Sequence, residues 1–322
     1  MPDAFIPGLH HVTALSGAAQ DNLDFYAGVL GLRRVKTTVN FDDPKTHHLY
    51  YGDTVGRPGT VITFFPWPRA RSGRNGAGMV NTVTFAVPAG TIDAWATHLN
   101  DAGVDTTRHD HFGDPALRFE DPAGLALALI ATDEMDNTGA WDDGPVPADR
   151  AIRGFHAPTL PVFSDDRTPD LLTKVFGWTR ADEDGDHVRF RAPEPDLAGI
   201  VDLEIRDRHP SGRMGTGTVH HVAFRARDAD EQQHWQRALR DRGIQVTDVK
   251  DRQYFQSIYF RDPNWTSGIL FEIATDGPGF LTDESEADLG KTLRLPSWLE
   301  SRRDEIESSL PSLTAPVSRR SE

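Results

Sequence analysis

The stretch Thr218-Val219-His220-His221-Val222-Ala223-Phe224 is an apolar, strand-like run with two adjacent histidines near its start. Near the N-terminus, Gly8-Leu9-His10-His11-Val12-Thr13 has the same pattern. A third run, Gly268-Ile269-Leu270-Phe271-Glu272-Ile273-Ala274, carries one carboxylate among uncharged residues. Two imidazoles and one carboxylate form a trio that binds Fe(II) and leaves coordination positions open. The three runs therefore predict one metal site assembled from distant parts of the chain.

These runs belong to a larger internal repeat. Strand-like runs begin four units, at residues 9–15, 80–87, 154–162 and 219–226. Each is followed by a helix-like segment, at residues 21–30, 91–102, 168–176 and 228–242, with apolar spacing typical of helices that bury one face. Further strand signals follow each helix, at 48–51 with 60–65, 117–119 with 125–130, 188–190 with 200–205, and 257–260 with 269–274. The sequence predicts an α+β fold of four β-α-β-β-β modules.

A linker rich in Asp, Gly and Pro, at residues 133–150, is the best domain boundary. It separates an N-terminal pair of modules, residues 1–135, from a C-terminal pair, residues 150–276. Residues 277–322 are expected to form a C-terminal helical strap over the core, with an amphipathic helix around 298–310 and disorder from about Ala315.

The composition favours a small-molecule partner. With 34 basic and 49 acidic residues the formal net charge is -15, which opposes binding to nucleic acid or to an anionic membrane. The chain has no cysteine, so a metal must be bound by His, Asp or Glu. The N-terminus lacks a signal pattern and no apolar run is long enough to span a bilayer, so we expect a cytoplasmic protein.

Aligning the modules assigns each histidine a structural position. His11 and His221 are the second residues of equivalent pairs, and alternation along a strand predicts that His10 and His220 face the other way or lie behind the metal ligands. The position of Glu272 corresponds to Thr63 in the first module, counted from the turn glycines, and to Ala128 or Leu129 in the second.

The third module offers a rival. His156 aligns with His11, and Glu204 aligns with Glu272. If the third and fourth modules shared one cup, His156 would replace His11 as a ligand, or Glu204 would add a fourth ligand. The residues alone leave this alternative open. His48, on a strand with Tyr50, is expected to be a packed imidazole beside a pocket.

The chain resembles the vicinal oxygen chelate superfamily (glyoxalase/bleomycin resistance/dioxygenase), and within it the hydroquinone-type ring-cleaving dioxygenases. The resemblance covers nearly the whole chain. It rests on motifs such as Asp21-Asn22-Leu23-Asp24-Phe25-Tyr26, Val39-Asn40-Phe41-Asp42-Asp43-Pro44, Arg153-Gly154-Phe155-His156, Tyr259-Phe260-Arg261 and Phe271-Glu272-Ile273-Ala274-Thr275. The turn at residues 262–268 is longer than the family's usual Pro-Gly turn, which affects the expected shape of the pocket mouth.

The resemblance implies two open barrel-like cups, with the first and fourth modules forming the one that holds metal. It implies Fe(II), less commonly Mn(II), bound by His11, His221 and Glu272. By the same motif matching, the surrounding catalytic positions are His10, Thr13, His220, Arg252 and Tyr259.

The implied activity is extradiol-type ring cleavage of hydroquinone or a related dihydroxybenzene with O2. Two other functions stay open: a glyoxalase-like metal-dependent isomerase or lyase, and a non-catalytic resistance protein that binds an aromatic compound or quinone. The expected partners are a small aromatic substrate and O2, and a homo-oligomer is compatible with the sequence.

Overall fold

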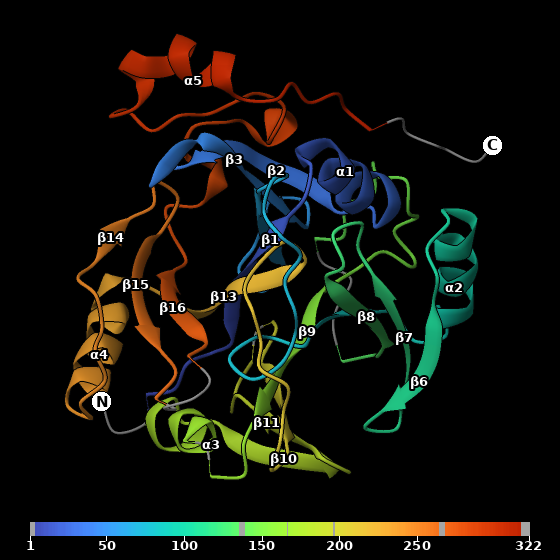
Figure 1. Cartoon of the computed structure of the whole chain (residues 1–322), viewed down its shortest axis with the longest axis vertical. Coiled ribbons are helices and arrows are strands. Elements are labelled where there is room, and N and C mark those ends of the chain that lie inside the picture. Colours follow the sequence, from blue (N-terminus) through green and yellow to red (C-terminus); the bar gives the residue numbers. More distant parts are fainter. Residues whose placement is uncertain (1–3, 135–138, 166, 196, 264–267, 317–322) are drawn as a thin grey trace.

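The computed structural model describes residues 4–134, 139–165, 167–195, 197–263 and 268–316, and it is a mixed α+β fold built on two curled eight-stranded sheets (Figure 1). The first sheet has the order β14-β15-β16-β13-β1-β4-β3-β2. Its strands, in that order, are Lys250–Asp251, Gln256–Arg261, Leu270–Thr275, Thr218–Ala226, Leu9–Ser16, Val61–Pro66, Asp43–Gly52 and Arg33–Asn40.

The second sheet has the order β10-β11-β12-β9-β5-β8-β7-β6. Its strands, in that order, are Thr179–Asp184, His187–Arg191, Ile200–Ile205, Gly154–Val162, Thr82–Val87, Ala126–Ala131, Asp114–Glu120 and Thr107–His111. The two sheets have the same topology, because each joins two β-α-β-β-β modules through the antiparallel pairing of their first strands. The predicted modules and fold class are confirmed.

The modules pair across the linker. The first and fourth modules share the first sheet, and the second and third share the second sheet. The alternative in which the third and fourth modules share one cup is therefore wrong. The division of the chain into three units, at residues 1–135, 150–276 and 277–322, stays a prediction.

The predicted helices are present, although two of them are partly wider π-helices. In the first module α1 (Ala19–Leu23) continues as the π-helix η1 (Asp24–Val29), and in the third α3 (Thr168–Asp170) continues as η2 (Leu171–Val175). The other two are α2 (Ile92–Asp101) and α4 (Ala229–Arg240). The side chain of Asp228 accepts a hydrogen bond from the backbone N–H of Glu231 and so caps the start of α4.

The position of one strand in each module was not predicted. In the structure these four strands, β2, β6, β10 and β14, lie at the sheet edges. An edge strand has only one neighbouring strand, and its exposed side chains carry little apolar alternation. All six residues of β10 are exposed. The hydrophobic period that revealed the central strands is therefore weak at these edges.

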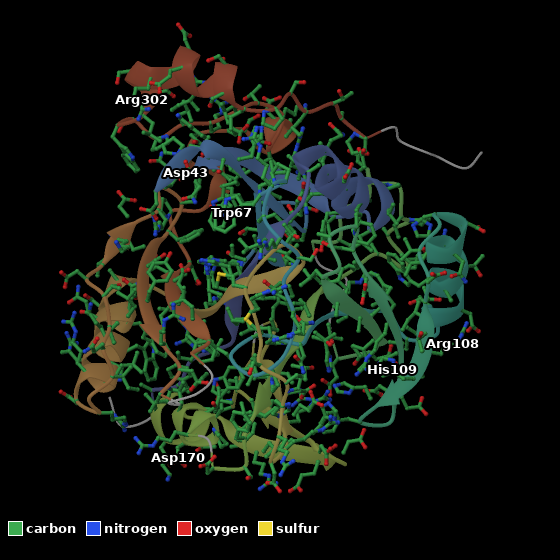
Figure 2. All side chains as sticks on the ribbon, viewed as in Figure 1. Asp43, Trp67, Arg108, His109, Asp170 and Arg302 are labelled. Atoms are coloured by element: carbon green, nitrogen blue, oxygen red, sulfur yellow. The ribbon has the colours of Figure 1, made fainter. Side chains whose placement is uncertain are left out.

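The C-terminal segment covers the β2 edge of the first sheet as a strap, with the short helices η3 (Phe280–Thr282), η4 (Glu286–Asp288), η5 (Glu300–Arg302) and α5 (Arg303–Ser309) (Figures 1 and 2). Leu295, Leu299 and Ile306 of the strap pack with Val39 of β2. The predicted strap is confirmed. Residues 317–322 and 264–267 lie outside the described part, so the expected disordered end and much of the long turn are not described.

No helix within the described ranges is both long enough and apolar enough to cross a membrane.

The strap is also held by a buried ion-pair cluster around Lys36 of β2. The side chain of Lys36 is fully buried, and its Nζ lies 2.6 Å from Asp283 Oδ1 and 3.1 Å from the carbonyl oxygen of Phe280, to which it donates. It also pairs with Glu284, whose side chain is fully buried. Breaking such a pair leaves an uncompensated charge in the interior.

We expect Lys36→Met to lower the free energy of unfolding by about 3–5 kcal/mol, because Glu284 would lose its buried partner. Urea unfolding followed by circular dichroism measures this change. Lys291→Met is the matched control, because Lys291 pairs with Asp288 at the surface, and it should leave stability near the wild-type value. Equal losses in the two variants would contradict the assigned role of Lys36.

Candidate metal centre

Two transverse rows of the first sheet carry the predicted site. The first row crosses β1, β13, β16 and β15. Its paired residues, in that order, are His11, Ala223, Glu272 and Tyr259. In the next row, two residues along β1, Thr13 is opposite His221. Residues two apart on a strand face the same side. The rows therefore bring residues from both ends of the chain to one face.

The trio His11, His221 and Glu272 converges as predicted. The Nε2 atoms of the two histidines are 3.3 Å apart, and Glu272 Oε2 lies 3.0 Å from His221 Nε2 and 3.6 Å from His11 Nε2. All three residues are buried, and their ligand atoms lie within 4.8 Å of one another. Among the described residues, this is the one group of three or more candidate ligands of this kind.

Each candidate ligand histidine is oriented by the histidine that precedes it. His10 Nδ1 is 2.9 Å from His11 Nδ1, and His220 Nδ1 is 2.8 Å from His221 Nδ1. If Nε2 of the ligand histidine presents its lone pair, its Nδ1–H donates to the neighbouring ring. A hydrogen bond at the far nitrogen fixes the ring orientation and tautomer of a metal-binding histidine.

The predicted alternation of the histidine pairs is interrupted by two β-bulges. The ladder between β1 and β13 passes from Leu9 to His11 and skips His10, and on the other strand it passes from His221 to Val219 and skips His220. A bulge re-aims a side chain. His220 consequently lines the same cavity as His221, whereas His10 packs behind His11, where its ring lies 5.0 Å from that of Phe255.

The donor atoms fit a cation. Ser257 Oγ donates to Glu272 Oε1 at 2.5 Å, while Glu272 Oε2 is buried and has no hydrogen-bond partner among the described residues. Burial lowers the pKa of His221 to about 3 and also lowers that of His11, so both rings are neutral. Two neutral imidazoles and an unsatisfied carboxylate oxygen, converging on one point, suit a divalent metal ion.

A cavity of about 420 Å³ opens beside the trio. Its wall is largely aromatic and includes Phe41, Phe65, Phe255 and Trp67, the last of which is labelled in Figure 2. A cavity of this size that combines aromatic side chains with polar groups is typical of a small-molecule site.

Arg252 and Tyr259 line one side of this cavity. Arg252 Nε donates to the phenolic oxygen of Tyr259 at 3.2 Å, and its two Nη atoms each lie 3.2 Å from Asp42 Oδ2 across the cavity mouth. Burial raises the pKa of Tyr259, and the carboxylate of Glu272 raises it further. Tyr259 is therefore a neutral phenol that faces the trio beside a fixed cation.

A family model described as Glyoxalase/Bleomycin resistance protein/Dioxygenase superfamily matches residues 8–129 and 154–273. The chain belongs to this superfamily.

Its relatives carry names that indicate dioxygenase activity. It is 46% identical over 305 residues to MhqO of Bacillus subtilis (strain 168), a protein named provisionally as a ring-cleaving dioxygenase, with 94% of this chain and 95% of MhqO covered. It is 34% identical over 310 residues to chlorohydroquinone/hydroquinone 1,2-dioxygenase of Sphingobium indicum, with 94% and 95% covered.

A crystal structure of a Bacillus subtilis protein, provisionally named a dioxygenase, superposes with a TM-score of 0.92. The two chains are 44% identical, and the match covers 97% of this chain and 99% of the other. The architecture of the two sheets is therefore that of the superfamily.

The second sheet has other residues at the positions of the candidate metal ligands. Its ladder between β5 and β9 has a bulge that skips His156, so His156 corresponds to His10 and Ala157 corresponds to His11. By the same registers, Thr82 and Ala128 take the places of His221 and Glu272. The sequence alignment of His156 with His11 is wrong by one residue. The strands β1 and β9 carry equivalent bulges, so Gly154 aligns with Gly8 and His156 aligns with His10.

The alignment of Glu204 with Glu272 is also wrong. The residue opposite Thr159 of β9 is Asp202, just as Thr63 is opposite Thr13, so Asp202 corresponds to Thr63. Burial opposes ionisation of Asp202, but hydrogen bonds from Arg189 and His111 lower its pKa to about 2. Arg189 donates to both oxygens of Asp202, at 2.8 and 2.9 Å. An ion pair therefore occupies this part of the second sheet.

Two contributors to the first site were not predicted from the sequence. Ser257, which bonds Glu272, precedes Tyr259 by two residues on β15, so same-face spacing in that strand was the available signal. Phe255 packs against both His10 and His11. It precedes β15, and no periodic pattern pointed to it.

Removing a ligand should abolish metal binding. We expect His11→Ala, His221→Ala and Glu272→Ala each to lose stoichiometric Fe(II) or Mn(II), because each removes one of three donors. Ser257→Ala should weaken binding by about 10- to 100-fold through loss of the carboxylate's orientation. Metal content after anaerobic loading and desalting measures both effects.

His156→Ala is the matched control, because His156 is a buried histidine in the equivalent region of the second sheet. Its metal content should equal that of the wild type. Loss of metal in this variant with retention in His11→Ala would overturn the assignment of the ligands.

Proposed function

We propose that this protein is an Fe(II)-dependent extradiol-type dioxygenase that cleaves the ring of hydroquinone or a related dihydroxybenzene with O2. The observation that carries the proposal is the buried trio of His11, His221 and Glu272 beside an aromatic cavity. The name of the Sphingobium indicum relative supports the substrate class. Mn(II) is the alternative metal.

The trio would hold the metal from one side, which leaves the cavity side for substrate and O2. A bound Fe(II) would supply the redox chemistry that lets O2 react with an electron-rich ring. The protein's contribution is to fix the three donors, which it does through His10, His220 and Ser257. The aromatic side chains of the wall can pack against a flat ring.

Three side chains near the trio, Tyr259, His220 and Arg252, can exchange protons or hydrogen bonds with a substrate. Tyr259 is a neutral phenol held by Arg252, so it can donate a proton or hydrogen bond to a substrate oxygen. His220 lines the cavity, and burial lowers its pKa to about 3, so its ring is neutral. Because its Nδ1 accepts from His221, its Nε2–H can donate a hydrogen bond to a substrate oxygen. Arg252 can stabilise a negatively charged substrate oxygen. Burial lowers the pKa of His10 to about 4, and His10 acts by orienting His11.

The donor set favours the dioxygenase over the isomerase. A glyoxalase-like reaction is expected to need a second carboxylate in the cup, at the position of Thr63. The hydroxyl of Thr63 instead bonds Thr13 and His48, and no further carboxylate joins the trio within the described part of the chain. A protein that only binds an aromatic ligand does not require the complete trio.

Oxygen uptake is the direct test of the reaction. After anaerobic reconstitution with Fe(II), we expect hydroquinone or a methyl- or chlorohydroquinone to cause stoichiometric O2 consumption and a new ring-cleavage absorbance. Catechol serves as the comparison substrate. Full metal loading without O2 uptake on any of these compounds would refute the proposal and leave the isomerase or the binding protein.

Tyr259→Phe tests the proton donor. We expect turnover to fall by about 10²- to 10⁴-fold, because the phenolic proton is removed while the ring is kept. Metal content should not change. Tyr51→Phe is the matched control, because the Tyr51 hydroxyl is buried without a hydrogen-bond partner among the described residues and does not line the cavity. Equal turnover in both variants would exclude this role for Tyr259.

A further inference from the structure

Four polar side chains form a continuous hydrogen-bonded chain on the side of the cavity away from Glu272. The phenolic oxygen of Tyr50 lies 2.8 Å from His48 Nδ1. His48 Nε2 lies 2.8 Å from Thr63 Oγ1, which lies 2.8 Å from Thr13 Oγ1. The chain thus crosses from β3 through β4 to β1.

The sheet register explains why these side chains meet. Tyr50 is opposite Thr63, Thr63 is opposite Thr13, and Thr13 is opposite the metal-ligand candidate His221. His48 precedes Tyr50 by two residues and faces the same side. Thr13, His48 and Tyr50 all line the cavity. The hydrogen-bonded chain therefore ends beside the proposed metal.

His48 is held so that both of its nitrogens are used. Its ring lies between those of Tyr50 and Phe65, with centroid distances of 4.1 and 4.3 Å. Burial lowers its pKa well below the ordinary value, and the neighbouring His221 and Arg252 lower it further. A neutral imidazole has one N–H donor and one acceptor nitrogen. It can therefore transmit the direction of a hydrogen bond from one side of the ring to the other.

The chain can run in two directions. In the first, Tyr50 donates to His48 Nδ1, His48 Nε2–H donates to Thr63, Thr63 donates to Thr13, and the Thr13 hydroxyl hydrogen points away from the chain. In the second, every bond is reversed and the hydroxyl hydrogen of Tyr50 needs another acceptor. Burial raises the pKa of Tyr50 well above 10, so its proton is retained. Within the described residues the Tyr50 hydroxyl has one hydrogen-bond partner, His48, so its hydrogen is satisfied only in the first direction.

We propose that Tyr50 and His48 are positioning residues that, through Thr63, orient the Thr13 hydroxyl as a hydrogen-bond donor to a substrate oxygen bound beside His221. The dihydroxybenzene identity of that substrate rests on the proposed function, whereas the direction of the chain does not. A donor aimed at a phenolate oxygen stabilises its negative charge in a water-poor site.

The tautomer of His48 tests the direction without any turnover. Two-bond ¹H–¹⁵N correlation spectra of the full chain, labelled at histidine nitrogens and loaded with diamagnetic Zn(II), report which ring nitrogen carries hydrogen. The His48 signals are assigned by their absence in His48→Gln. We expect the Nε2–H tautomer. An Nδ1–H tautomer would show that the chain runs the other way and would overturn the proposal.

Substitutions along the chain test its effect on the reaction. We expect Thr13→Val, Thr63→Val and His48→Leu each to lower kcat/KM by about 10- to 100-fold, with metal content unchanged. His48→Gln should recover most of this loss, because one amide can accept from Tyr50 and donate to Thr63. Tyr50→Phe should lower kcat/KM less than His48→Leu, because the Nε2–H can still form.

His47→Leu is the matched control. His47 is the preceding residue of β3, and its ring bonds the carbonyl oxygen of Pro311 in the strap, so kcat/KM should stay near the wild-type value. Equal activity of His48→Leu and His48→Gln would overturn the positioning role. If no variant and no wild-type protein cleaves any ring, the proposed function fails while the tautomer measurement still decides the direction of the chain.

Discussion

The antiparallel pairing of β1 with β13 is the interaction on which the site depends. It joins the first and fourth modules into one sheet and places His11 and His221 on adjacent strands, although 210 residues separate them in sequence. Each strand also carries a bulge at the first histidine of its pair. The bulges turn His10 and His220 towards the Nδ1 atoms of the ligand candidates, so the same pairing supplies both the donors and the groups that orient them.

The sequence predicted the features that depend on local period and on repetition, such as the central strands, the helices and the equivalence of the two histidine pairs. It could not predict which modules share a sheet, because that depends on pairing between distant strands; the family resemblance supplied this expectation. It also misaligned His156 by one residue and Glu204 by two, because the register between paired strands is not visible as a local composition or spacing signal. His48 was expected to be packed, and it is packed, but its two hydrogen bonds required the cross-strand register.

In the second sheet, other residues occupy the positions that correspond to the three ligand candidates. Ala157, Thr82 and Ala128 occupy the three ligand positions, and the ion pair of Arg189 with Asp202 takes up buried space nearby. Such a pair satisfies both charges internally. In the first sheet, by contrast, Glu272 Oε2 is buried and has no hydrogen bond among the described residues. An unsatisfied buried carboxylate oxygen is costly unless a cation is bound, which favours a cation in the first sheet and not in the second.

The two halves of the first sheet correspond residue by residue, and the correspondence accounts for their different roles. Glu272 is opposite Tyr259 on β15 as Thr63 is opposite Tyr50 on β3, so Thr63 takes the place of a second carboxylate. Two residues before these tyrosines, Ser257 donates to Glu272 in one half and His48 bonds Thr63 in the other. A carboxylate at the position of Thr63 would add a fourth ligand candidate to the trio. A hydroxyl there adds no donor to the trio and bonds Thr13 instead. The first module therefore supplies one ligand candidate, His11, and the fourth module supplies two, His221 and Glu272.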